Sequence, residues 1–397
     1  MVRLAYLVSH PIQYQAPLLR RLALQPDIDL KVFFGTNTAN GFHDPGFGSA
    51  VKWDVPLLEG YEHEFLPSLA GGEINTVRPL NWGLGRRLKR GAFDVLWVHG
   101  YTRLTSILGI VAAKRLGLRV MVRDEANGAD VRANGAREAV RRIFYTVLSR
   151  FADAFLAIGT LNRDYYRRAG VAEERIFSVP YAVDNAFFRE RAARAASGRE
   201  ALRRELGLMA RRPVILFSGK LVSRKGPLLL AEAYKRLSWD ARSEPEPYLL
   251  FAGDGELRGA IEKFATDLGW RSIRVLGFKN QSELPGLYDL CDLFVLPSSY
   301  EPWGLVVNEV MNAGKPVIAS DCVGCWPDLV KPGVNGAVFP AGDAQALGDT
   351  MAATLSDRDN LYRMGEASRG IIDKWSFDED LAGIRAALRY LTDRRRA

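Results

Sequence analysis

Cysteine and histidine are scarce in this sequence, which contains 3 cysteines and 4 histidines among 397 residues. Three cysteines are too few for a disulfide framework, and so few thiols suit a reducing compartment. Cys322 and Cys325 form one CxxC pair, but a structural zinc site usually needs four ligands and no second pair follows. We therefore expect neither a disulfide-rich protein nor a metal site.

Long apolar runs are also absent. The apolar opening over residues 1–9 is too short to span a membrane, and it runs into Pro11 without the pattern of a signal-peptide cleavage site. No window reaches the roughly 18 uninterrupted apolar residues that a membrane-spanning helix requires. We interpret the opening as a buried strand, and we expect a cytoplasmic protein whose membrane contact, if it has one, is peripheral at the inner face.

Composition and length indicate an ordinary globular protein. Hydrophobic residues make up 48% and charged residues 25% of the chain, without the excess of polar residues that accompanies disorder. A chain of 397 residues is longer than one hydrophobic core usually organises. We therefore expect two domains of similar size.

Positive charge is concentrated in the first half of the chain. Residues 78–150 contain fifteen Lys or Arg against five Asp or Glu, with clusters at 86–90 and 137–142. Such a basic face is compatible with a solvated surface, an anionic membrane, a phosphate-bearing acceptor or nucleic acid. Charge alone does not choose among these interpretations.

Short apolar runs rich in β-branched and aromatic residues alternate with longer amphipathic stretches, which is typical of βαβ units and a parallel sheet. In the first half we predict strands over residues 2–8, 30–34, 95–98, 120–122 and 154–158. A second alternating series begins at Pro213 with PVILFSG, after a break over residues 179–190. The fold class is therefore α/β, with two doubly wound, Rossmann-like domains. We place the domains at residues 1–185 and 186–375, followed by a helical tail at 376–397, for which packing back on the first domain is one arrangement.

Polar residues follow the strands of the first half. They are Ser9 and His10, His99 and Gly100, Arg123 with Asp124 and Glu125, and Gly159 and Thr160. Ligands of open α/β sheets bind at the carboxyl ends of the strands, so we expect these residues to line one wall of a cleft. For His10 and His99 the alternative is a strand-end residue that is satisfied by backbone groups.

In the second half, the segment EPWGLVVNEVMNAGKPVIAS places Glu301 and Glu309 on either side of a glycine-containing turn. We predict a helix that starts near Gly304 or Leu305, and the N–H groups and positive dipole of its first turn suit a diphosphate. The two carboxylates are suited to accept hydrogen bonds from the hydroxyls of two sugars. The alternative is a pair of surface carboxylates near a helix start.

A turn rich in cations follows the strand PVILFSG. Its members are Lys220, Arg224, Lys225 and Gly226. A diphosphate leaving group gathers negative charge as the bond to the sugar breaks, and fixed cations stabilise that charge. The alternative is an ordinary helix-start surface. Further turns follow or neighbour strands of the same half at residues 253–255, 275–278 and 332–336, and their common order favours the ligand-binding interpretation.

Taken together, these motifs resemble the C-terminal half of retaining glycosyltransferases of the GT-B fold, in the large group called family four or group 1. The resemblance runs over residues 179–339 and rests on VPYAVD, SGKLVSRKG, AGDGE, VLGF, LCDLFVLPSSYEPWGLVVNEVMNAGKPVIASD and PGVNGAVF. It implies a glycosyltransferase with an inter-domain cleft. The first domain is then expected to bind the acceptor and the second a nucleotide-diphosphate sugar.

The resemblance also implies roles for single residues of the second half. Lys220 and Lys225 would hold the donor diphosphate, Glu309 the ribose hydroxyls, and Glu301 the transferred sugar. The implied donor site comprises Gly219, Lys220, Lys225, Gly253, Gly255, Phe278, Pro302, Gly304, Leu305, Val306 and Glu309. Lys220 replaces the usual arginine of the family, which keeps the charge but not the planar fork. The other departures are Tyr181-Ala182 in place of Asn-Gly and Glu256 in place of a common proline, and they blur the identity of the donor.

The opening SHPIQYQAPLLRRL resembles a subset of the family that has His-Pro-x-Gln-Tyr at the end of the first strand. It implies that His10 faces the cleft and that Gln13 and Tyr14 bind the acceptor. The segment RDEAN is similar to the Arg-Gly-Glu-Ser of that subset. The candidate catalytic residues are Glu301, His10, His99, Arg123, Asp124 and Glu125, and which of the last three points inward stays open.

The resemblance implies a retaining reaction in which the acceptor attacks from the leaving-group face, assisted by the departing phosphate and without a covalent enzyme intermediate. A glycosidase-type carboxylate pair is not expected, because its two carboxyls must flank the scissile bond. We expect no cofactor and no obligatory metal, because Lys220 and Lys225 supply the charge that a metal would otherwise supply. The Asp-x-Asp triplets that begin at Asp27, Asp357 and Asp378 fall outside the expected cleft.

We therefore expect a glycosyltransferase that moves a sugar from a nucleotide-diphosphate sugar to a sugar or lipid-linked acceptor, in bacterial polysaccharide, lipid-linked oligosaccharide or glycoconjugate assembly. One alternative is a nucleotide-sugar epimerase of related architecture. Another is a basic protein that binds nucleic acid or a membrane, although residues 78–150 lack the aromatic interleaving typical of nucleic-acid binding. Uridine, guanosine and adenosine donors all stay open.

Overall fold

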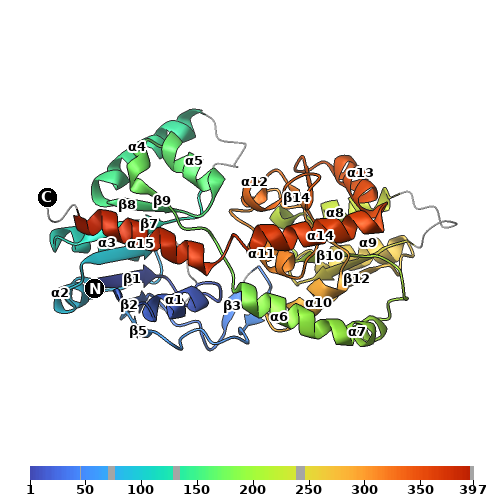
Figure 1. Ribbon diagram of the computed structural model, residues 1–397, viewed down its shortest axis with the longest axis horizontal. Coiled ribbons are helices and arrows are strands. Elements are labelled where there is room, and N and C mark those ends of the chain that lie inside the picture. The colour runs from blue at the N-terminus through green and yellow to red at the C-terminus, as the bar shows by residue number, and fades with distance from the viewer. Residues whose placement is uncertain (45, 70–76, 128–134, 238–245, 394–397) are drawn as a thin grey trace. The chain divides into compact units, whose positions relative to one another are not determined.

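The computed structural model describes residues 1–44, 46–69, 77–127, 135–237 and 246–393, and the chain divides into two compact units (Figure 1). The first unit comprises Met1–Gly41, Val55–Ala182 and Ser376–Ala397. The second unit comprises Phe42–Asp54 and Val183–Trp375.

The first unit is built on a seven-stranded sheet with the order β5-β2-β1-β6-β7-β8-β9. In spatial order, the strands are β5 (Glu62–Phe65), β2 (Ile28–Phe34), β1 (Val2–Val8), β6 (Val95–His99), β7 (Arg119–Arg123), β8 (Ala154–Ala157) and β9 (Ile176–Ser178). Every neighbouring pair is parallel. The carboxyl ends of all seven strands therefore lie at one edge of the sheet.

Helices cover both faces of this sheet. They are α1 (Ala16–Ala23), α2 (Leu84–Arg90), α3 (Leu104–Arg115), α4 (Gly135–Phe151), α5 (Thr160–Arg168) and α15 (Phe377–Asp393), with a 3₁₀ turn at Glu173–Arg175. Successive side chains of a strand point to opposite faces, so Leu4 and Tyr6 of β1 pack in one core with α1 and α15. Ala5 and Leu7 pack in the other core, with α2 to α5.

The C-terminal helix α15 is an integral part of the first unit. It packs against β8, β9 and α1, and it is drawn in red in Figure 1. Gly383 permits this approach, because a Cβ atom there would lie 1.9 Å from the carbonyl oxygen of Ser178. Arg385 also pairs with Asp27 at 2.8 Å. The tail beyond residue 376 is thus held by both packing and charge, as far as residue 393, where the described residues end.

The second unit is built on a six-stranded parallel sheet with the order β12-β11-β10-β13-β14-β15. The strands are β10 (Val214–Ser218), β11 (Tyr248–Ala252), β12 (Ile273–Val275), β13 (Leu293–Leu296), β14 (Val317–Ser320) and β15 (Gly336–Phe339). The helices are α6 (Asn185–Ala195), α7 (Arg199–Glu205), α8 (Pro227–Lys235), α9 (Arg258–Asp267), α10 (Leu284–Leu290), α11 (Leu305–Asn312), α12 (Trp326–Leu329), α13 (Ala344–Leu355) and α14 (Arg358–Ile372), with 3₁₀ turns at Ala196–Gly198 and Ser223–Lys225. Strands β10, β11 and β13 are fully buried and read as continuous apolar runs.

A short hairpin of β3 (Phe42–Asp44) and β4 (Ser49–Val51) belongs to the second unit, although residues 1–185 were expected to form the first domain. The reason lies in its side chains, because Asp44 pairs with Lys220 and Phe47 packs against Phe278. These partners are far away in the chain, so no local pattern could reveal them.

Two edge strands of the first sheet were also not predicted. Strand β5 has the sequence EHEF, whose charged side chains do not form an apolar run, and β9 has only three residues. Both lie at the sheet edges, where one side needs no partner strand. Among the described residues, no helix has the length and apolarity required to cross a membrane.

Candidate functional site

The carboxyl ends of β10 and β11 meet in two glycine turns. Gly219 and Gly255 have φ values of +152° and +149°, a region that side chains disfavour. A Cβ atom at Gly253 would lie 1.8 Å from the carbonyl oxygen of Gly219. The two turns therefore pack backbone against backbone, and this contact orients the chain that leads into Lys220.

The ammonium group of Lys220 contacts both carboxylate oxygens of Asp44, at 2.8 Å each. Lys220 Nζ also lies 5.1 Å from the centre of the Phe47 ring. The cation predicted for a diphosphate is thus paired with a carboxylate of the hairpin. Sequence reasoning missed Asp44, which lies in no recognisable motif.

The second predicted cation, Lys225, pairs with Glu301, which lies in the loop after β13. Gly226 brings the two turns together, because a Cβ atom there would lie 2.4 Å from the carbonyl oxygen of Pro297. The amide of Ser299 also donates to the carbonyl of Arg224 at 2.9 Å. The structure therefore joins Lys225 and Glu301 at one point, with Glu301 only 8% exposed.

Helix α11 begins beside Glu301, as the sequence predicts. Gly304 precedes it with a φ of +99°, and no side chain among the described residues caps this helix start. The first turn carries no acidic residue, and Pro302, Leu305 and Val306 are half-buried around it. Its amide groups and positive dipole end are suited to an anion.

Glu309 lies in the same helix and is only 1% exposed. The hydroxyl of Tyr288, from α10, donates to one of its carboxylate oxygens. The adjacent Asn308 accepts from the indole N–H of Trp303 at 2.9 Å. Glu309 is therefore a buried, oriented carboxylate. This excludes the alternative that Glu309 is a surface carboxylate near a helix start.

Phe278, at the turn after β12, is half-buried. Its ring centre lies 5.0 Å from that of Phe47 and 6.2 Å from that of Trp53. The position predicted for a nucleobase contact thus borders two further aromatic rings, and both come from the hairpin segment.

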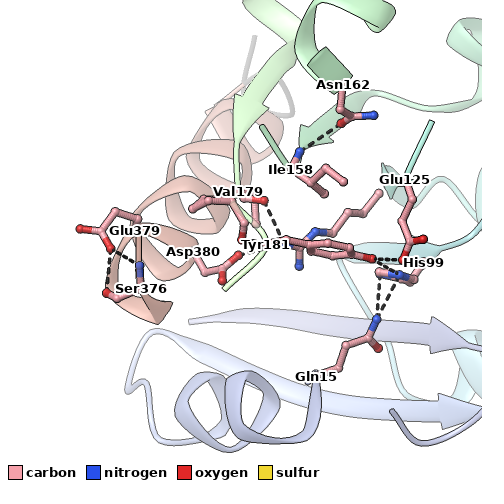
Figure 2. A network of polar contacts seen from close by, with 12 residues as sticks. Gln15, His99, Glu125, Ile158, Asn162, Val179, Tyr181, Ser376, Glu379 and Asp380 are labelled. Atoms are coloured by element: carbon pink, nitrogen blue, oxygen red, sulfur yellow. Dashed lines mark hydrogen bonds and ion pairs between the residues drawn. The ribbon is translucent and has the colours of Figure 1, made fainter. Parts of the chain in front are cut away.

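A polar network occupies the strand ends of the first unit (Figure 2). His99 Nε2, at the end of β6, lies 3.0 Å from Gln15 Nε2 and 3.1 Å from the hydroxyl of Tyr181. Tyr181 donates to Glu125 at 2.6 Å, and Tyr6 donates to Gln15 at 2.6 Å. Tyr181, which was not predicted for this site, thus links His99 to Glu125.

Burial controls the protonation of this network. It lowers the pKa of His99 well below its usual value, and the positive charges of Arg123 and Arg103 act in the same direction. The imidazole is therefore neutral near pH 7. Burial raises the pKa of Asp124 to about 6, although its carboxylate accepts from the amide of Ala126 at 2.6 Å.

Arg123, predicted as a catalytic candidate, is a buried side chain whose described hydrogen bonds go to other parts of the first unit. Its guanidinium is 2% exposed and donates to the carbonyls of Val179 and Pro180 at 2.9 Å and to Asp380 at 3.1 Å. It also lies 4.6 Å from the centre of the Tyr181 ring. Of the three candidates at the end of β7, Arg123 is buried, Asp124 is half-buried and Glu125 is exposed.

His10, Gln13 and Tyr14 lie in the turn before α1 and are half-buried. His10 Nδ1 lies 2.8 Å from the hydroxyl of Ser9. In the same segment, Gln15 rather than Gln13 reaches His99. The signal for Gln15 was present in the motif HPIQYQ, but residue type alone could not distinguish the two glutamines.

Arg103 is a further residue that the sequence reasoning missed. It precedes α3, and its charge helps to lower the pKa of the nearby His99. Burial lowers the pKa of Arg103 itself, and the charge of Glu125 partly offsets this. Its Nη1 atom is buried without a hydrogen-bond partner in the described part of the chain. A cation at this strand end could contact an anionic ligand.

The remaining motifs have structural roles. Asp27 and Asp378 pair with Arg385 and Arg21, and Asp357 caps α14. Cys291, Cys322 and Cys325 are buried thiols. Over the described ranges, no group of three or more His, Cys, Asp or Glu side chains could hold a metal ion.

Comparison with known proteins identifies the family. A model described as "Glycosyl transferases group 1" matches residues 198–370, and one described as "Glycosyl transferase 4-like domain" matches residues 15–182. The chain is 31% identical over 241 residues to the alpha-D-kanosaminyltransferase of Streptomyces kanamyceticus, covering 59% of this chain and 60% of the relative. It is also 31% identical over 240 residues to the D-inositol 3-phosphate glycosyltransferase of Xylanimonas cellulosilytica, covering 59% and 56%. The match thus spans less than two thirds of either relative.

The fold is also that of a known structure. The chain is similar to HepE of Anabaena, solved in complex with UDP and glucose, with a TM-score of 0.69, 17% identity and 100% coverage of both chains. At this identity the similarity shows the fold alone. Together with the two parallel sheets, it confirms the predicted α/β GT-B fold.

Proposed function

Because the chain belongs to the group 1 glycosyl transferases, we propose that it transfers a sugar from a nucleotide-diphosphate sugar to an acceptor hydroxyl. One observation carries this proposal. Lys220, the pair of Lys225 and Glu301, and the start of α11 all follow carboxyl ends of neighbouring parallel strands in the second unit. Cations, helix amides and a buried carboxylate are the groups that a sugar diphosphate requires.

In this proposal, the donor diphosphate binds Lys220, Lys225 and the first amides of α11. The bond between the anomeric carbon and the phosphate oxygen breaks, and negative charge builds up on the diphosphate, where these groups stabilise it. The acceptor oxygen bonds to the same face of the anomeric carbon, and its proton passes to the departing phosphate. The configuration is retained, and no metal is required because the lysines balance the charge.

Glu309 is the proposed ligand of the ribose hydroxyls, and Glu301 that of the transferred sugar. Both are largely buried, so a hydrogen bond from a sugar hydroxyl would be strong there. UDP and glucose, which are present in the HepE structure, are reasonable first ligands to test. Guanosine and adenosine donors belong in the same panel.

We propose the network of Gln15, His99, Glu125 and Tyr181 as the acceptor side, with Arg103 as an anion contact. It lies at strand ends, where ligands of parallel sheets bind. A nucleotide-sugar epimerase would use similar donor contacts but would turn over without an acceptor. Release of nucleoside diphosphate that depends on an added acceptor therefore separates the two activities.

We also propose that the acceptor belongs to polysaccharide, lipid-linked oligosaccharide or glycoconjugate assembly, and that the enzyme works at an anionic membrane surface. The support for the membrane surface is an exposed apolar stripe on α4. Its members start at Val140 and follow at helical offsets of 3, 4, 7 and 11 residues, at Ile143, Phe144, Val147 and Phe151. Tyr145 and Leu148 on the same helix are buried in the core, so the stripe is a second apolar face.

The basic composition of helices α3 and α4 favours an anionic membrane over a second copy of the chain. Helices α3 and α4 together contain six Lys or Arg and one acidic residue, and of these Lys114 pairs with Asp153 at 2.9 Å. A second copy would bring like charges together, whereas acidic lipids complement them. The side chains of Arg137, Arg141 and Arg142 lie outside the described part of the structure. In the other predicted basic cluster, Arg87 is already paired with Glu64 at 2.5 Å.

The donor assignment is tested by thermal stabilisation with UDP, GDP, ADP and their sugars. A ligand at a hundred times its Kd adds about 2.7 kcal/mol, which raises the midpoint by several degrees in domains of this size. Glu309→Gln should abolish the shift, whereas Glu256→Gln, an exposed carboxylate of the nearby glycine turn, should preserve it. The proposal fails if no nucleotide stabilises the wild-type protein.

A further inference from the structure

The hairpin segment Phe42–Asp54 lies over the ends of three strands of the second unit. Asp44 contacts Lys220 after β10, and Phe47 and Trp53 contact Phe278 after β12. Between them, a Cβ atom at Gly255, after β11, would lie 2.9 Å from the carbonyl oxygen of Gly46. The segment thus covers the positions where the proposed function needs a diphosphate and a nucleobase.

Asp44 is oriented specifically towards Lys220. Its Oδ1 atom accepts from the amide of Gly46 at 2.8 Å, and both carboxylate oxygens lie 2.8 Å from Lys220 Nζ. The Asp44 side chain is only 14% exposed. The carboxylate therefore occupies the coordination positions on the ammonium group that a phosphate would use.

The two ends of the segment are held differently. At its C-terminal end, the side-chain amide of Asn280 donates to the carbonyl of Lys52 at 2.8 Å, and the amide of Ser282 donates to Asp54 at 3.2 Å. The turn end is held mainly by the Asp44 ion pair and the Phe47 ring contact. A hairpin with three residues in each strand has little stability of its own, so its turn end can move at low cost.

From these contacts we propose that the hairpin is a specificity element of the donor site. Asp44 competes with the donor for Lys220, so a ligand must bring more negative charge than one carboxylate to displace it. Phe47, Trp53 and Phe278 offer aromatic surfaces for a base. The ligand class selected is a nucleoside diphosphate, and a nucleoside monophosphate binds less well because it competes with Asp44 using fewer phosphate oxygens. This inference rests on the proposed function of the second unit.

The test measures the Kd values of UDP, GDP, ADP and the corresponding monophosphates for the full chain by calorimetry. Asp44→Asn removes the competing charge and keeps the side-chain shape, so diphosphate binding should tighten about fivefold to tenfold, the range expected for a partly buried ion pair near 1 kcal/mol. Monophosphates should gain more than diphosphates, because the proposal assigns their weaker binding to competition with Asp44; an equal gain would overturn the selectivity. The matched control is Asp54→Asn, in the same segment but paired with Ser282, which should leave the Kd values unchanged.

A second measurement does not depend on nucleotide binding. Without ligand, amide hydrogen exchange in residues 46–51 should be faster in Asp44→Asn than in the wild type and in Asp54→Asn. Unchanged Kd values in Asp44→Asn, while the wild type binds a diphosphate, would overturn the competition but leave the donor site intact. Absence of binding to any nucleotide, even in the wild type, would overturn the donor site and this inference together.

Discussion

Replacing Asp380 with alanine should destabilise the first unit strongly. Asp380 and Arg123 form an ion pair at 3.1 Å, with side chains only 1% and 2% exposed. Removing one partner of such a pair leaves a buried charge uncompensated and typically costs about 3 to 5 kcal/mol. Arg123 keeps its hydrogen bonds to the carbonyls of Val179 and Pro180, so we expect the lower end, about 3 kcal/mol.

This loss should lower the unfolding midpoint of the first unit by about 6 to 12 °C, at about 2 to 4 °C per kcal/mol for a unit of this size. Because two compact units need not unfold together, the assay is peptide-level hydrogen exchange across a temperature series, read on β7 and α15. It is made at about pH 8, because burial raises the pKa of Asp380 to about 7 and the ion pair is complete only above that value.

Asp378→Ala is the matched control. Asp378 lies in the same helix and pairs with Arg21 at 2.9 Å, but the two side chains are 78% and 45% exposed. An exposed pair contributes about 0 to 1 kcal/mol. The double variant Arg123→Met/Asp380→Leu should recover most of the loss, since it removes both charges. If Asp380→Ala costs no more than Asp378→Ala, the argument from burial is wrong.

Two further predictions concern protonation and the membrane. The pKa of His99 is lowered in the folded chain, so below about pH 6.5 the unfolded chain binds more protons than the folded chain. As the pH is lowered through this range, the free energy of unfolding decreases by up to about 1.4 kcal/mol per pH unit. Asp124 and Asp380, with their raised pKa values, act in the opposite sense. Urea unfolding of the wild type is therefore compared with that of His99→Gln, and identical pH slopes would contradict the prediction. For the α4 stripe, Val147→Asp should weaken binding to anionic vesicles about tenfold, whereas the control Leu24→Asp, at a residue that is 79% exposed, should not. Equal losses in both variants, or equal binding to neutral vesicles, would refute a specific membrane face.

Much of the second unit could be predicted from the sequence, because the patterns that indicate its strands and turns are local. The apolar runs of β10, β11 and β13 predict buried strands by their composition alone. The turn glycines at 219, 255 and 304 have φ values that only glycine adopts readily. The short stretch from 301 to 309 likewise joins Glu301, the start of α11 and Glu309 within one segment of chain.

Less of the first unit could be predicted from the sequence, because its key contacts join residues that are distant in the chain. Gln13 and Gln15 are equally polar, and only the packing of α1 against the sheet decides which one reaches His99. The edge strand EHEF has no apolar alternation to reveal it. The stripe on α4 looks like core in the sequence, and exposure alone distinguishes it from the buried face that carries Tyr145.

The two α/β domains, the glycine turns and the family can be inferred from the sequence alone, because they depend on residues that are neighbours in the chain. The partners of the charged side chains, in contrast, depend on contacts between segments that are distant in the chain. The sequence presents Arg123 as a candidate ligand contact, and in the structure it donates to Asp380, 257 residues away. The sequence presents Lys220 as an unpaired cation, but in the structure it forms an ion pair with Asp44, 176 residues away. A charge acts according to its burial and its counter-charge, and both are set by segments that meet only when the chain folds.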